Sequence, residues 1–215
     1  MRAHQRVRRG QRDRLVPHRR GSAMIELALL LGIGIPMLLG VTGVGLRLGR
    51  TIQATQVVRD VGHMYALGTD FSLAGTQDIA RTLSGSFSLT ATGDAVLMLS
   101  RVVKVFQTDC TAAGLQTCPN LNQPVLAQRI VIGNAGLRSS QYGTPPAVYV
   151  DTKGNIQPAE YCKESTLIAG SFDSLMALEQ GQSAWLVEGY FSMPDLNLLG
   201  GDQQHGGGYY ARLVF

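Results

Sequence analysis

The chain has 215 residues and a formal net charge of +4, a length that suits one compact domain with an added segment. The positive charge has a local origin, because the first 20 residues hold eight arginines and one acid, whereas the rest of the chain holds more acids than bases. A nucleic-acid-binding protein needs basic side chains on the folded surface that meets the phosphates, so this distribution argues against nucleic acid as a partner.

An uncharged run follows the basic start. Residues 27–46 read LALLLGIGIPMLLGVTGVGL, and a helix of this length, at about 1.5 Å per residue, spans the roughly 30 Å hydrocarbon layer of a membrane. A core helix of a soluble domain would rarely be apolar on every face over such a length. Because arginines precede the run and few charges follow it, we expect the N-terminus in the cytoplasm and the chain after Arg47 on the other side of the membrane.

The junction between the arginines and the apolar run contains Gly21, Ser22 and Glu26. An ionised carboxylate at the start of an apolar helix is costly unless it is paired or reaches the headgroup layer. If a peptidase cut the chain after Gly21, Ser22 would carry a new α-amino group with a pKa near 8. That cation could pair with the Glu26 carboxylate of a neighbouring copy. Without such a cut, Glu26 could lie in the membrane interface beside Arg20.

This junction resembles the class III signal of type IV pilins and pseudopilins, and residues 19–68 are similar to the TadE-like minor pilins of the tight-adherence pilus system. The resemblance implies that a prepilin peptidase removes the leader 1–21, with Gly21 and Ser22 at the cleavage site and Glu26 in recognition and assembly. It also implies a bacterial inner-membrane protein with a periplasmic or extracellular domain. Its partners would be other pilin subunits and the pilus assembly platform.

Three alternatives remain open at this point. A pseudopilin of a type II secretion system shares the same N-terminal signal. A single-pass, membrane-anchored extracytoplasmic binding protein with no pilus role would keep its leader. A conventional secretory signal could be cut near 43–45, although the apolar run is longer than the core of such signals.

The helix is expected to continue beyond the membrane. Over residues 47–67, apolar side chains recur at spacings of three and four, which is typical of an amphipathic helix. The members of this stripe are Leu48, Ile52, Val57 or Val58, Val61, Met64 and Tyr65. Gly68 is expected to end the helix, and Pro36 to kink it. We therefore predict one N-terminal helix over 22–68, with a transmembrane part at about 27–46.

Residues 69–215 are predicted to form the exported domain. Runs rich in branched and aromatic residues predict strands, and a short helix is expected over 76–83. In the run at 184–191, Trp185, Val187 and Phe191 alternate with Glu188 and Tyr190. The expected strands are 95–106, 128–132, 147–150, 184–191 and 209–215. The fold class is therefore α+β, with the long helix packed on a mainly antiparallel sheet.

The chain has three cysteines, all in the part expected outside the cytoplasm, where disulfides form. Cys110 and Cys118 are close in sequence, so closing their loop costs less entropy than reaching Cys162. We predict the Cys110–Cys118 disulfide, with Cys162 free or paired with another chain. No histidine is spaced to join the cysteines in a zinc site, and no catalytic motif stands out. We therefore expect no cofactor, no metal and no enzymatic activity.

Overall fold

The computed structural model describes residues 20–193 and 207–215. The chain divides into two compact units, Met1–Thr42 and Gly43–Phe215. Most of the predicted leader lies outside the described residues. Only its last two positions, Arg20 and Gly21, belong to the first helix.

Helix α1 covers Arg20–Ala66 and includes Pro36 without interruption. Gly68 closes its C-terminus with φ of 90°, a left-handed conformation that glycine adopts without a steric penalty. The Gly68 amide donates to the Tyr65 carbonyl and the Thr69 amide to the Met64 carbonyl, both at 3.0 Å. These two bonds form a Schellman motif, which satisfies carbonyls that the end of the helix leaves unpaired.

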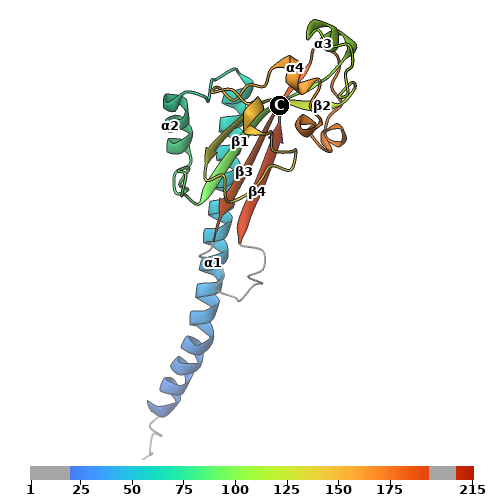
Figure 1. The fold of residues 1–215 in the computed structure, drawn as a ribbon. Coiled ribbons are helices and arrows are strands. Elements are labelled where there is room, and N and C mark those ends of the chain that lie inside the picture. The colour runs from blue at the N-terminus through green and yellow to red at the C-terminus, as the bar shows by residue number, and fades with distance from the viewer. Residues whose placement is uncertain (1–19, 194–206) are drawn as a thin grey trace, which may run out of the picture. The chain divides into compact units, whose positions relative to one another are not determined.

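The C-terminal unit contains a four-stranded sheet, shown in Figure 1 with the helices around it. The strands are β1 (Ala95–Lys104), β2 (Pro124–Gly133), β3 (Ser183–Ser192) and β4 (Gly208–Val214). Their order is β2-β1-β3-β4 and every neighbouring pair is antiparallel. The predicted α+β class, with a long apolar N-terminal helix and an antiparallel sheet, is confirmed.

One face of the sheet packs against the part of α1 that belongs to the C-terminal unit. Val58, Val61 and Tyr65 of α1 lie in one core cluster with Leu97 of β1 and Phe191 of β3. At the start of the predicted stripe, the side chains of Leu48 and Ile52 are 59% and 50% exposed. The buried stripe begins at Ala54, where the helix first meets the sheet.

The opposite face of the sheet is covered by the long segment between β2 and β3, which forms a second core cluster with β1, β2 and β3. The strand predicted at 147–150 was wrong: Ala147–Tyr149 is a 3-10 turn that follows Pro146. Only Val150 makes a strand-like bridge, to Ile156. The remaining helical elements are α2 (Ala74–Leu83), α3 (Gln107–Ala112), α4 (Pro158–Tyr161) and the 3-10 turns Ser165–Leu167 and Phe172–Ser174.

Candidate functional site

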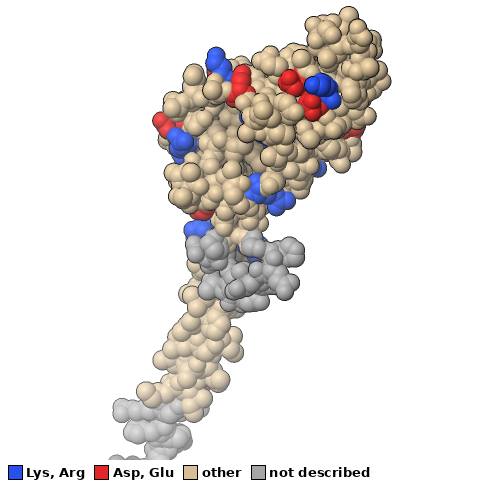
Figure 2. Space-filling view, in the orientation of Figure 1, with Lys and Arg blue, Asp and Glu red and all other residues tan. Residues whose placement is uncertain are grey.

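The predicted cleavage and assembly residues all lie in the first turns of α1. The backbone is helical at Gly21 and Ser22, and Glu26 is exposed about one turn further along. Its apolar neighbours Met24, Ile25 and Leu27 are 76%, 64% and 56% exposed. Figure 2 shows charged side chains on the C-terminal unit, while the visible surface of this helical stretch carries none.

The apolar stretch has no buried side within the described residues of the chain. From position 23 to 39 every side chain is exposed, and α1 is long and apolar enough to cross a membrane. Exposure of apolar surface to water costs about 25 cal/mol per Å². The stretch therefore needs an apolar environment, which a lipid bilayer or other apolar helices can provide.

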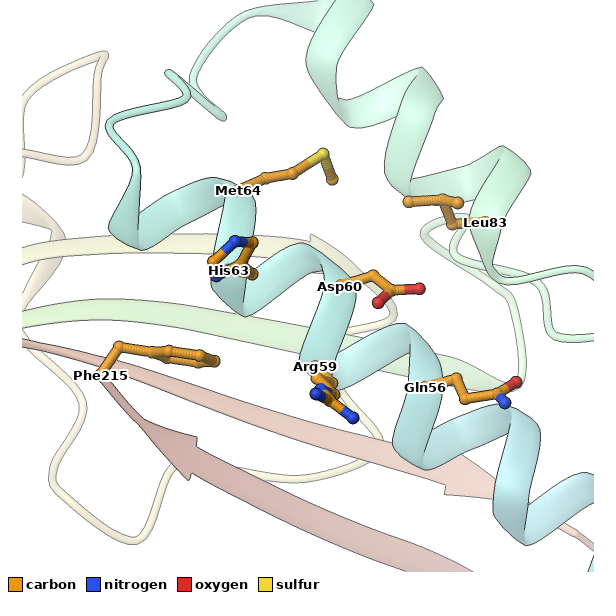
Figure 3. A pocket seen from close by; sticks show the side chains of 7 residues that line it. All are labelled: Gln56, Arg59, Asp60, His63, Met64, Leu83 and Phe215. Carbon is orange, nitrogen blue, oxygen red and sulfur yellow. The ribbon is translucent and has the colours of Figure 1, made fainter.

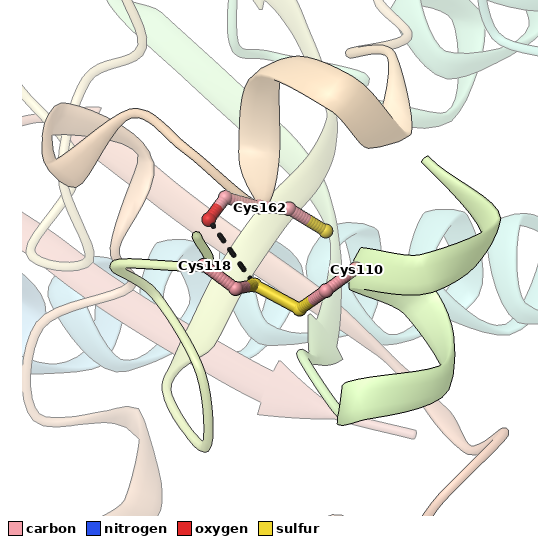
Figure 4. A group of neighbouring side chains, drawn as sticks. All are labelled: Cys110, Cys118 and Cys162. Carbon is pink, nitrogen blue, oxygen red and sulfur yellow. Dashed lines mark hydrogen bonds between the residues drawn. A yellow bond between two sulfur atoms is a disulfide. The ribbon is translucent and has the colours of Figure 1, made fainter. Parts of the chain in front are cut away.

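Three cysteines meet where α3, α4 and the loop after α3 come together (Figure 4). Cys110 and Cys118 form a disulfide with their Cα atoms 5.9 Å apart. Cys162 is a buried thiol, and the three sulfur atoms lie within 4.8 Å of one another. Burial raises the pKa of the Cys162 thiol, and the nearby charge of Asp109 raises it further.

This cysteine group is, among the described residues, the one cluster of His, Cys, Asp or Glu side chains with the spacing of a metal site. Metal binding needs thiolates, and the disulfide removes two of the three. In the oxidised form the group therefore acts as a covalent link between α3 and the following loop. Cys162 remains a protonated thiol beside that link.

A buried ion pair lies on the face of the sheet away from α1. Arg129 of β2 and Glu188 of β3 approach to 3.6 Å, with side chains 6% and 0% exposed. Glu188 also accepts hydrogen bonds from the Ser140 hydroxyl, from the Gln141 amide at 3.0 Å and from the Tyr210 hydroxyl at 2.8 Å. Burial lowers the pKa of Arg129, and the charge of Glu188 opposes that shift.

Glu188 points away from α1, opposite Val187 and Phe191, with which it alternates in sequence. The segment after β2 covers its side chain completely. Arg138 in that segment lies over the Tyr210 ring at 4.4 Å, and Arg212 of β4 donates to the Tyr142 hydroxyl. The network therefore fixes this segment on the sheet. The signal in the sequence that could have indicated this buried network is an acid within an otherwise apolar strand.

A hollow of about 730 Å³ lies on the exposed side of α1 within the C-terminal unit. Figure 3 shows its lining side chains from α1 together with Leu83 of α2 and the C-terminal Phe215. The Phe215 ring lies close to the helix, with its centroid 6.5 Å from that of His63. His63 therefore lies on a surface beside an aromatic ring rather than in a group of metal ligands.

No protein-family model, no curated protein and no solved structure matches this chain.

Proposed function

We propose that this protein is a minor pilin or pseudopilin that takes part in assembling a tight-adherence, type IV-like pilus. The observation that carries the proposal is Glu26, a carboxylate in a helical stretch whose neighbouring side chains are apolar and exposed. Such a carboxylate is costly in hydrocarbon unless it is paired or reaches the headgroup layer. Cleavage after Gly21 would create a cation at Ser22 that could pair with the Glu26 carboxylate of a neighbouring copy.

The α-amino group of Ser22 has an expected pKa near 8 and would be cationic at neutral pH. In a helix that starts at Ser22, this group and Glu26 are separated by about one turn. A neighbouring subunit shifted by one turn could therefore present its carboxylate to this amine. The apolar side chains around Glu26 would pack between the same two helices. Gly32 and Gly40 leave open space along α1, which permits close approach of helices.

The proposed location follows from the same features. The N-terminus lies in the cytoplasm, α1 anchors the chain in the inner membrane, and the C-terminal unit faces the periplasm or the exterior. A disulfide between Cys110 and Cys118 suits an oxidising compartment. The proposed partners are a prepilin peptidase, other pilin subunits and the assembly platform.

The first test is leader removal. The full-length chain is expressed with an active or an inactive prepilin peptidase, and mass spectrometry determines the N-terminal residue in the membrane fraction. We expect Ser22 as the first residue with the active enzyme and Met1 with the inactive enzyme. Gly21→Leu should block cleavage, whereas Gly32→Leu, the same change inside the apolar stretch, should leave it intact.

Two outcomes would contradict the proposal. A Met1 start in the presence of active peptidase would indicate a simple membrane-anchored protein. A start near Leu46 would indicate a conventional secreted protein. If Ser22 is found, sheared filaments are collected from strains that each lack one assembly ATPase. The ATPase on which recovery of the chain depends then distinguishes a tight-adherence pilin from a type II secretion pseudopilin.

A further inference from the structure

A second hollow lies in the C-terminal unit, where α1 ends over the sheet. Arg101 of β1 is paired in register with Gln128 of β2 and with Trp185 of β3, so the three residues form one row across the sheet. Helix α1 covers this face as far as Tyr65, and Gly68 then turns the chain away. The uncovered row lines a cavity of about 330 Å³, within the size range of small-ligand sites.

One wall of this cavity is held by a chain of hydrogen bonds. The Tyr65 hydroxyl donates to Gln128 Oε1 at 2.9 Å, and Gln128 Nε2 donates to the Lys153 carbonyl at 3.2 Å. The Asp151 carboxylate accepts from the backbone amides of Lys153 and Asn155 at 2.8 and 2.7 Å. The wall is therefore fixed before any ligand arrives, which lowers the entropy cost of binding.

Two cations, Arg101 and Lys153, line the cavity together with one acid, Asp70. A second carboxylate, that of Asp151, lies behind the lining and accepts from the Lys153 amide. In the part of the chain that the structure describes, neither cation has a carboxylate within 4.0 Å, and the buried Nε of Arg101 has no hydrogen-bond partner. An unsatisfied buried donor is costly. The terminal N–H groups of the same guanidinium are the donors left for an acceptor on a bound anion.

The cavity also offers an aromatic surface. Trp185, the only tryptophan of the chain, lines the cavity and is partly exposed, whereas the neighbouring lining residues Tyr65 and Phe71 are 3% and 0% exposed. Aromatic rings provide large, flat apolar contact areas. A ligand that suits this site therefore combines an anionic group with a flat, partly apolar ring and hydroxyl groups.

We propose that this cavity binds a carboxylate-bearing pyranose, the unit of an acidic polysaccharide. The planar Arg101 guanidinium matches a carboxylate, because its parallel N–H groups can donate to both oxygens. Lys153 adds charge, and the Trp185 ring contacts the C–H face of the sugar. Asp70 and Asn155 on the rim supply polar groups for the hydroxyls. The proposal is independent of leader processing, and a retained leader would leave it unaffected.

The test uses the full-length chain in a detergent without a sugar headgroup, with Trp185 fluorescence as the readout. The probes are D-glucuronate, D-glucose, which lacks only the carboxylate, and acetate, which lacks only the sugar. We expect a saturable fluorescence change with D-glucuronate, and binding of D-glucose and acetate that is weaker by about tenfold or more, because a charge-assisted hydrogen bond or a ring contact is lost. The proposal would be overturned if D-glucose or acetate bound as tightly as D-glucuronate. It would also be overturned if neither fluorescence nor calorimetry detected saturable binding of D-glucuronate.

Variants locate the binding in the cavity. Arg101→Gln should weaken glucuronate binding by about tenfold, whereas Arg59→Gln, on the exposed side of α1, should leave it unchanged. Lys153→Gln is a second cavity variant on an exposed loop, and it should weaken binding even if Arg101→Gln disturbs folding. Circular dichroism checks the fold of each variant. Binding that is unaffected by both cavity variants would overturn the assignment.

Discussion

At the scale of single residues, Glu188 is an acid in a buried ion pair. It is fully buried, and Arg129 supplies the balancing charge at 3.6 Å. Glu188→Gln keeps the shape of the side chain but leaves Arg129 buried without its counter-ion. We expect the free energy of unfolding to fall by about 3–5 kcal/mol, as for other broken buried pairs. Urea unfolding of the full-length chain in detergent measures this loss.

The double variant Arg129→Met/Glu188→Leu serves as the control for the same pair. It removes both charges together, so it should be more stable than Glu188→Gln alone. A loss below about 1 kcal/mol for Glu188→Gln would fall in the range of exposed pairs, and would contradict the burial of this one.

Tyr65 gives the chain a specific sensitivity to alkaline pH. Burial raises its pKa above the ordinary value of about 10. Above about pH 10 the unfolded chain loses this phenol proton and the native chain keeps it, so the unfolded state binds fewer protons and stability falls as pH rises. Below that pH the contribution is fully present. Tyr65→Phe should make the decline between about pH 10 and 12 shallower, by up to about 1.4 kcal/mol per pH unit.

The measurement is the free energy of unfolding at a series of alkaline pH values, for the original chain and for Tyr65→Phe. Only the slopes are compared, because the variant also loses the hydrogen bond to Gln128. Burial also raises the pKa of Tyr210, and that residue is present in both proteins. Parallel slopes would show that Tyr65 is not protected in the folded state.

At the scale of elements, α1 approaches β3 closely at Gly189. A Cβ atom at this position would touch Val58 of α1, and would lie 2.9 Å from Phe191 and 3.2 Å from Leu97. Gly189→Ala should therefore destabilise the protein by about 1–3 kcal/mol through overpacking. Gly75→Ala in α2, where nothing lies within 4 Å of the new Cβ, should instead stabilise it by about 0.5–1 kcal/mol.

Thermal unfolding of the two variants gives a matched comparison, because the same methyl group is added in both. Opposite shifts of the midpoint are expected. If Gly189→Ala were neutral, the helix would have to lie further from β3 than the structure places it.

The elements that the sequence predicts correctly are those with local signals. Branched residues over 95–106 and 184–191 predict β1 and β3, because strands with a buried face require them. The run at 147–150 has the same composition, but it is short and follows Pro146, so it forms a turn. The segment between β2 and β3 has no period, and its position over Glu188 depends on contacts distant in sequence.

At the scale of the whole molecule, the two candidate sites differ in how far the sequence predicts them. Glu26 and the apolar run are adjacent in sequence, so a membrane helix with a carboxylate near its start can be predicted directly. The cavity beside Trp185 depends on the pairing of Arg101 with Gln128 and with Trp185. Register between strands follows from turns and side-chain packing over the entire sheet, so single runs of sequence do not reveal it.

The division of the chain predicts that the C-terminal unit folds by itself. All three core clusters consist of residues from Ala54 onward, and the unit extends over Gly43–Phe215. A variant that begins at residue 43 loses the exposed apolar residues up to 42. It should therefore be soluble without detergent, and it should unfold in a single cooperative transition in urea.

A variant that begins at residue 67 is the matched control, since it also lacks the apolar stretch but has no part of α1. It loses Val58, Val61 and Tyr65, which are 0%, 0% and 3% exposed, and each buried side chain of this kind contributes about 1.5–3 kcal/mol. The bare sheet face should bind a hydrophobic dye and aggregate. If the variant from residue 43 aggregated as well, the last turns of α1 would be insufficient to complete the core. The apolar part of α1 before residue 43 would then be needed for folding.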